Sequence, residues 1–167
     1  DSTTVKGDII SFSYEDQTNF ANAGSGNTDF DCEAMIVVDN RIYLFTKQWV
    51  SAGTVLYELP AEPGTHVAKK KGSLQTNGLV TAATIDPATR IIVLVGYGVP
   101  LLNRFIYLLY DYKGDDFFSG NKRKMTIMGS KQTEGALLIG NDQVWISNED
   151  SFFGAAVVEV LDLKAIV

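Results

Sequence analysis

The apolar residues of this chain come in short runs or alternate with polar residues at a period of two. The runs are rich in Val, Ile, Tyr and Phe, and almost none has the 3.6-residue spacing of an amphipathic helix. Gly, Asn, Asp and Pro, which favour turns, separate the runs. The pattern therefore predicts an all-β fold. We expect strands over residues 7–14, 33–37, 41–45, 54–59, 65–74, 81–85, 90–94, 104–112, 121–128, 134–138, 143–147 and 155–163.

One pattern occurs three times: a polar residue, a small residue, an apolar run, a turn and a second β-rich run. The three copies begin at Glu33, Thr81 and Glu134, so they recur with a period of about 50 residues. After each of the first two copies, the sequence predicts a third strand and then a more polar fourth strand. Four-stranded units with apolar inner strands and wet outer strands are typical of propeller blades. The chain is therefore predicted to form a β-propeller-type array of four-stranded antiparallel blades.

The predicted blade units cover approximately residues 5–20, 31–75, 78–129 and 132–167, within a single domain over residues 1–167. The first unit looks like a third strand without its own first two strands, and the last has room for three strands. About three and a half blades are fewer than the four to eight of a closed ring. We therefore expect a fragment of a larger propeller. The alternatives are a ring completed by two copies, an open stack, and a β-sandwich.

Composition narrows the classes of function. A hydrophobic content of 46% and a mean hydropathy of +0.04 suit a folded globular domain. No apolar run approaches the roughly 18 residues of a membrane helix, so no membrane span is expected. The net charge of −6 argues against a nucleic-acid partner. With Cys32 and His66 as its single cysteine and histidine, the chain can form neither an internal disulfide nor a multi-histidine metal site.

Glu33 and Glu134 are the strongest candidates for a functional site. Each precedes a small residue and opens the first strand of its unit, which in a propeller lines the central channel. Two carboxylates at equivalent positions would converge on one opening, and Thr81 is the third equivalent residue. A buried carboxylate is costly unless it is paired, bound to a metal or reached by water.

Converging carboxylates favour Ca²⁺, so Asp31, Glu33 and Glu134 form a predicted calcium site in the channel. The alternative is that these carboxylates face channel water or accept hydrogen bonds from backbone N–H groups. Trp49 follows a second strand, where loops emerge, and its ring is a candidate ligand contact beside Glu33, Thr81 and Glu134.

No set of residues indicates a reaction, and no catalytic residue is predicted. The chain contains no P-loop and no GxGxxG nucleotide motif. His66 falls on a predicted outer strand, far from Cys32 on an inner one, so these two residues are not expected to form a nucleophile–base pair.

Several longer motifs occur between residues 7 and 150. They are Asp31-Cys32-Glu33-Ala34, Leu44 to Trp49, Gly78 to Ala83, Tyr107 to Tyr112, Phe117 to Lys124, Thr133 to Ala136 and Ser147-Asn148-Glu149. Together they resemble a family of secreted β-propeller proteins common in Bacteroidetes, and the run Phe117 to Lys124 is the most specific of them. The motifs around Glu33 and Glu134 also resemble, more distantly, SdiA-regulated and phytase-like propellers, some of which hold calcium. The resemblance implies a secreted or cell-surface location, further blades, and no assigned activity.

We therefore expect an extracytoplasmic propeller module that binds or organises a small molecule, a glycan or a protein, with a cation site in its channel. Calcium is the cofactor that this site would take. Self-association or missing blades would complete the ring. The alternative from another class is a calcium-dependent hydrolase, phytase-like or esterase-like, that uses the same carboxylates.

Overall fold

The computed structural model describes residues 4–21, 24–98, 103–140, 142–150 and 154–164. Within these ranges the regular elements are twelve β-strands and no helix, which confirms the all-β prediction. Accordingly, the described residues include no helix that could cross a membrane.

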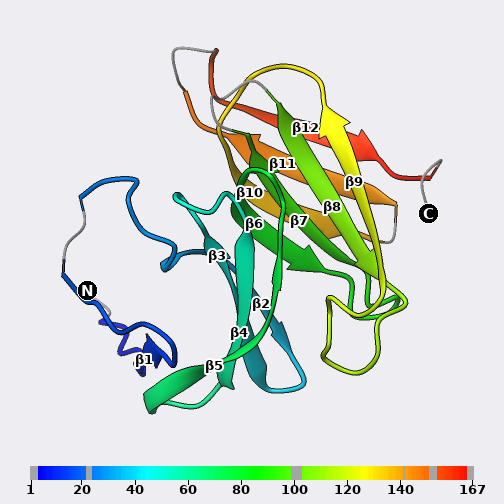
Figure 1. The fold of residues 1–167 in the computed structure, drawn as a ribbon. Coiled ribbons are helices and arrows are strands. Elements are labelled where there is room, and N and C mark those ends of the chain that lie inside the picture. Colours follow the sequence, from blue (N-terminus) through cyan, green and yellow to red (C-terminus); the bar gives the residue numbers. More distant parts are fainter. Residues whose placement is uncertain (1–3, 22–23, 99–102, 141, 151–153, 165–167) are drawn as a thin grey trace.

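The strands form three sheets, and from β2 onward the strands that follow one another within a sheet are neighbours (Figure 1). The first sheet contains β2 (Asp31–Val38), β3 (Arg41–Lys47), β4 (Thr54–Pro60) and β5 (Gly64–Leu74). The second sheet contains β6 (Leu79–Ile85), β7 (Ile92–Tyr97), β8 (Arg104–Tyr110) and β9 (Asn121–Ile127). The third sheet contains β10 (Thr133–Ile139), β11 (Gln143–Asn148) and β12 (Val157–Asp162). These eleven strands are antiparallel and lie within a few residues of their predicted positions.

The predicted turns separate the first and second strands of the sheets. Asp39 and Asn40 both have positive φ, at 49° and 58°, as a two-residue hairpin between twisted strands requires. The carboxylate of Asp86 accepts hydrogen bonds from the backbone N–H groups of Ala88 and Thr89, which holds the second turn. Gly140 opens the third turn with a φ of 62°, and its neighbour Asn141 lies outside the described residues.

The N-terminal strand β1 (Ile10–Tyr14) differs from the prediction, because it does not belong to a separate unit over residues 5–20. It pairs in parallel with β5 and adds a fifth strand at the outer edge of the first sheet. An aromatic contact explains this position: the rings of Tyr14 and Tyr57 lie 4.5 Å apart between centroids. Ion pairs of Glu15 with Lys69 and of Asp16 with Lys70 reinforce the contact between this segment and β5.

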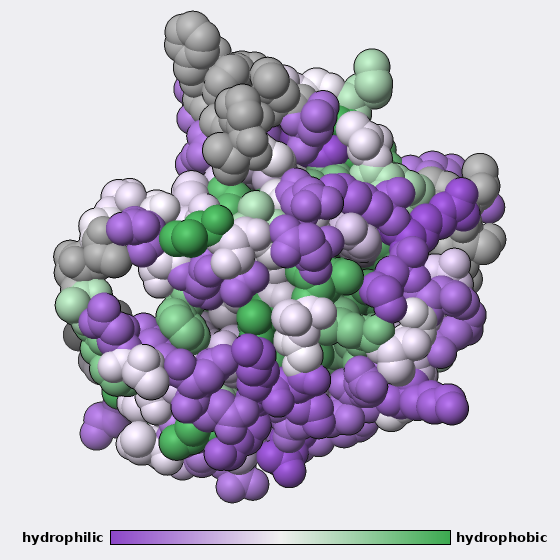
Figure 2. All heavy atoms as spheres, viewed as in Figure 1, coloured by the Kyte–Doolittle hydropathy of each residue, from purple (hydrophilic) through white to green (hydrophobic). Residues whose placement is uncertain are grey.

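The second sheet lies between the other two, and both of its faces are buried (Figure 1). Ile92 and Leu94 of β7 pack on the side of the first sheet, whereas Val93 and Val95 pack on the side of the third. Successive residues of a strand point to opposite faces, so one strand contributes to two cores. Figure 2 shows that polar side chains cover most of the molecular face in this view and that hydrophobic ones reach the surface near its centre.

β2, β6 and β10 are the first strands of the three repeat units. They lie next to one another, because β6 contacts β2 on one side and β10 on the other. The repeated polar residues Glu33, Thr81 and Glu134 all lie near the start of these strands. Equivalent positions of the repeat are thereby brought to the same end of the molecule.

Candidate functional site

Glu33, Thr81 and Glu134 each occupy a β-bulge near the start of the first strand of their sheet. In the first sheet Cys32 pairs with Thr46 and Ala34 with Phe45, so the ladder skips Glu33. The ladder of β6 and β7 skips Thr81 in the same way, and that of β10 and β11 skips Glu134. A bulge frees a side chain from the strict alternation of the strand and re-aims it. The repeated polar residue in the sequence therefore marks three equivalent bulges.

The small residue that follows each bulge lies where space is short. Ala34 is 1% exposed and Ala82 is 7% exposed. At Gly135, an added Cβ would lie 2.6 Å from the hydroxyl oxygen of Ser147. Close packing next to the bulge thus accounts for the second half of the polar–small pattern.

The carboxylate of Glu33 forms an ion pair with Lys47, the last residue of β3. The Lys47 ammonium donates hydrogen bonds to both carboxylate oxygens, at 3.0 and 2.9 Å. It also lies 4.3 Å from the ring centroid of Trp49 and 5.5 Å from that of Tyr97, within the range of cation–π attraction. Burial alone would lower the pKa of Lys47, but Glu33 and Tyr97 outweigh it and raise this pKa. Lys47 is therefore positively charged at neutral pH.

The two candidate glutamates share this electrostatic environment. Partial burial raises the pKa of Glu33, against the opposing effect of Lys47, and the charge of Asp31 adds to the increase. Partial burial also raises the pKa of Glu134, while Lys47 lowers it and the charges of Glu149 and Glu33 raise it further. Carboxyl groups from the first and third sheets thus lie close enough to influence each other's ionisation.

Asp31 and Trp49 contact each other beside this group. The indole N–H of Trp49 donates a hydrogen bond of 2.9 Å to the carboxylate of Asp31. A Cβ at Gly26 would lie 3.5 Å from the indole. The half-buried ring is thereby held in one orientation, next to the Lys47 ammonium.

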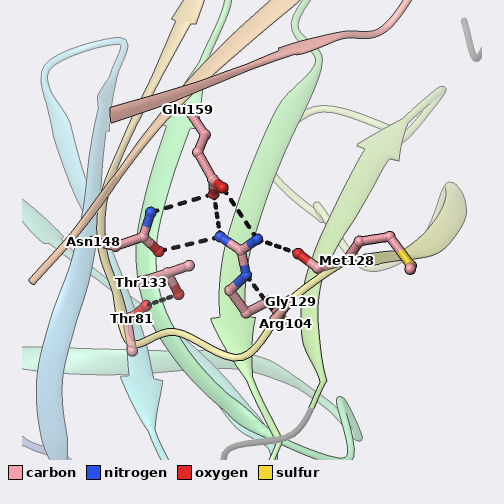
Figure 3. A network of polar contacts seen from close by, with 7 residues as sticks. All are labelled: Thr81, Arg104, Met128, Gly129, Thr133, Asn148 and Glu159. Carbon is pink, nitrogen blue, oxygen red and sulfur yellow. Dashed lines mark hydrogen bonds and ion pairs between the residues drawn. The ribbon is translucent and has the colours of Figure 1, made fainter. Parts of the chain in front are cut away.

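Thr81, the third equivalent residue, does not contribute to this charged group. Its hydroxyl oxygen lies 3.2 Å from that of Thr133, and both side chains are buried (Figure 3). This hydrogen bond joins the second sheet to the third. The buried Thr81 therefore contributes to the packing of the second sheet against the third.

A buried arginine near the two threonines also joins these sheets (Figure 3). Arg104 is the first residue of β8 and is 1% exposed. Its guanidinium forms an ion pair with Glu159 of β12 and donates hydrogen bonds to the side chain of Asn148 and to the carbonyls of Met128 and Gly129. The hydrogen bond from Arg104 holds the pKa of Glu159 below its usual value. This network fixes the third sheet against the second at the same end of the strands.

The residues of the predicted calcium site have different partners. Asp31 accepts from Trp49, Glu33 accepts from Lys47, and Glu134 interacts electrostatically with both Lys47 and Glu33. Among the residues that the structure describes, no group of three or more His, Cys, Asp or Glu side chains is placed to hold a metal ion. A lysine ammonium supplies the positive charge next to the carboxylates.

The sequence analysis did not predict the parts that Lys47, Tyr97 and Arg104 play. Lys47 ends an apolar run on β3 and is 4% exposed. Arg104 opens another apolar run on β8. A charged residue directly adjoining a run of buried apolar residues is the signal that could have identified both.

No family model, no curated protein and no solved structure matches this chain.

Proposed function

We propose that the chain is part of a β-propeller-type ring, in which each sheet is one blade, and that the ring is an extracytoplasmic binding or scaffold module. The side-by-side first strands and the two buried faces of the middle sheet support the radial arrangement. The second sheet has the four antiparallel strands of a blade. The location outside the cytoplasm follows from the resemblance to secreted Bacteroidetes propellers.

The ligand site of this module lies at the end of the first strands, where Glu33 and Glu134 occur. The supporting observation is the repeated bulge, which removes Glu33, Thr81 and Glu134 from the ladders of three separate sheets. A bulge disrupts the local ladder, and bulges are over-represented next to functional sites, where they re-aim a side chain. At two of the three positions the re-aimed side chain is a carboxylate.

A cation is the ligand that this site suits best. Asp31, Glu33 and Glu134 outnumber Lys47, so the local charge is negative even with the ion pair intact. The ring of Trp49 adds a face that attracts positive charge. Ca²⁺ is the first candidate because it prefers carboxylate oxygens, and an amine group of a small molecule, glycan or protein is the second.

Calorimetric titration of CaCl₂ into the purified chain tests the cation site. We expect a Kd of about 10⁻⁴–10⁻³ M, as in extracellular calcium modules. Glu134→Gln should weaken binding about tenfold or more, whereas Lys47→Met should strengthen it, because it removes the ammonium that competes for Glu33. Glu62→Gln is the control, because Glu62 lies in the turn between β4 and β5, away from the site. Equal heats from the unaltered protein and the Glu33→Gln/Glu134→Gln double variant would eliminate the cation site.

A calcium-dependent hydrolase, phytase-like or esterase-like, is the second candidate. It is favoured by the raised pKa of Glu134, since a carboxyl group that keeps its proton nearer neutral pH suits a general acid, while Glu33 is the ionised carboxylate paired with Lys47. Turnover of phosphate or carboxyl esters with calcium present, lost in Glu134→Gln, would establish it in place of the binding module.

A further inference from the structure

The third sheet has an exposed apolar face at one end of the array. Leu137 of β10, Trp145 of β11 and Val160 of β12 are cross-strand neighbours in one row. They are 55%, 43% and 51% exposed. Ile139 and Val158 extend the row on the same face, and both are exposed. We call these five residues the open face.

The residues equivalent to the open face are buried in the other two sheets. The pair Leu137 and Trp145 corresponds, in the repeat, to the pair Ile36 and Tyr43 of the first sheet. Those two residues are 4% and 3% exposed because they pack against the second sheet. Val93, the residue of the second sheet that corresponds to Trp145, is fully buried against the third sheet. The open face is thus the third copy of a packing surface whose other two copies are covered.

The first sheet carries the complementary surface at the opposite end of the array. Met35 and Val37 of β2 point away from the second sheet, and each is 55% exposed. The residues that correspond to Val37 are Ile85 on β6 and Leu138 on β10. Both of these pack against the preceding sheet. We call Met35 and Val37 the rear surface.

We propose that a second copy of this chain covers the open face, with the rear surface of each copy packed against the open face of the other. This contact continues the packing that already joins consecutive sheets within the chain. A two-fold axis makes both contacts at once and closes the assembly. Two chains of three sheets make a ring of six, within the four to eight blades of closed propellers. The inference rests on the radial arrangement proposed above and does not depend on the ligand.

The N-terminal segment leaves room for this contact. Tyr14 and Phe30 cover Leu44 and Tyr57, on the part of the first sheet's outer face formed by β3 and β4. Cys32, near the start of β2, contacts Tyr14, whereas Met35 and Val37 further along β2 stay exposed on that face. First strands are also the elements through which neighbouring sheets meet within the chain.

Light scattering coupled to size-exclusion chromatography tests the proposal on the full chain. We expect a dimer for the unaltered protein. Trp145→Lys and Val37→Lys should each weaken the dimer about 100-fold or more, because each places a charge in both contacts. Lysine avoids adding to the net charge of −6, which would itself cause repulsion. Val50→Lys is the matched control, since Val50 is 65% exposed but lies in the connection between β3 and β4, away from both surfaces.

An equimolar mixture of Trp145→Lys and Val37→Lys provides the sharpest test. The mixture should regain a dimer that is weaker than that of the unaltered protein. The intact open face of the Val37 variant can pack against the intact rear surface of the Trp145 variant, while the other contact carries both lysines and stays open. Unchanged circular dichroism and thermal unfolding would show that both variants are folded.

Three results would overturn the proposal. The first is an unaltered protein that is monomeric at about 100 μM, a concentration well above the Kd of a specific interface. The second is a Val37→Lys variant that stays dimeric while Trp145→Lys does not, and the third is the formation of open-ended oligomers. A monomer that still binds calcium would refute the second copy alone and leave the proposed cation site intact.

Discussion

Replacing Arg104 by methionine is expected to lower the free energy of unfolding by about 2–4 kcal/mol. The guanidinium is buried and is the hydrogen-bond donor to Glu159, Asn148 and the carbonyls of Met128 and Gly129. Methionine keeps most of the apolar stem but has no donor. The variant therefore leaves these acceptors without their partner.

The size of this loss depends on how many of the acceptors water can reach and hydrogen-bond in place of the guanidinium. A buried acceptor that loses its partner costs about 1–3 kcal/mol. The side chain of Asn148 is 5% exposed and loses this amount. Met128 and Gly129 are exposed residues, so water can replace part of the hydrogen bond to each carbonyl, and together they add about 1 kcal/mol. The side chain of Glu159 is 33% exposed, so water can replace part of its ion pair, and it adds less than a fully buried carboxylate would.

Urea unfolding followed by circular dichroism measures this loss. With an m-value of about 2 kcal/mol/M, the midpoint should fall by about 1–2 M. Arg41→Met is the matched control: Arg41 also opens a strand and pairs with a glutamate, but its side chain is 49% exposed. Its partner Glu58 keeps a second ion pair with Lys71, so this variant should lose less than about 1 kcal/mol. Equal midpoints for the two variants would refute the reasoning.

Two further predictions concern packing and pH. Gly96→Ala should lower the free energy of unfolding by about 3 kcal/mol, because its Cβ would lie 2.0 Å from the carbonyl oxygen of Leu79. Gly135→Ala should lower it much less, because its Cβ meets the hydroxyl of Ser147, which can rotate away. Similar melting temperatures for the two variants would contradict this. Glu134→Gln should gain stability relative to the unaltered protein as pH rises from the ordinary glutamate value of 4.5 through the raised pKa of Glu134. The folded state binds more protons than the unfolded state there, so ionisation of Glu134 opposes folding. A difference in unfolding free energy that stays flat with pH would contradict this assignment.

The strands could be predicted because their signals are local. The β-rich runs at 104–110 and 143–148 and the turn residues Asp39 and Asn40 act over a few positions, and the structure places strands and a hairpin there. The repeat also predicted which residues share one end of the molecule. The bulges themselves were not predicted, but they produce the polar–small pattern on which the candidate site was based.

The contacts between sheets could not be predicted, because alternation shows which face a residue takes but not what lies opposite. Nothing near β1 indicates that it pairs in parallel with β5, a strand about 50 residues away. Lys47 meets Glu33 only because the bulge shifts the register of the hairpin by one residue. The partners of Arg104 come from β11, from β12 and from the segment after β9, which no local pattern connects.

The bulges at Glu33 and Glu134 have a practical consequence for protein engineering. Backbone pairing passes over both positions, so the scaffold does not rely on their side chains for its hydrogen-bonded ladders. A library that varies these two residues together with Lys47 would change the chemistry of one rim of the molecule while the strands keep their register. The same fold could in this way be adapted to bind anions, aromatic groups or metals.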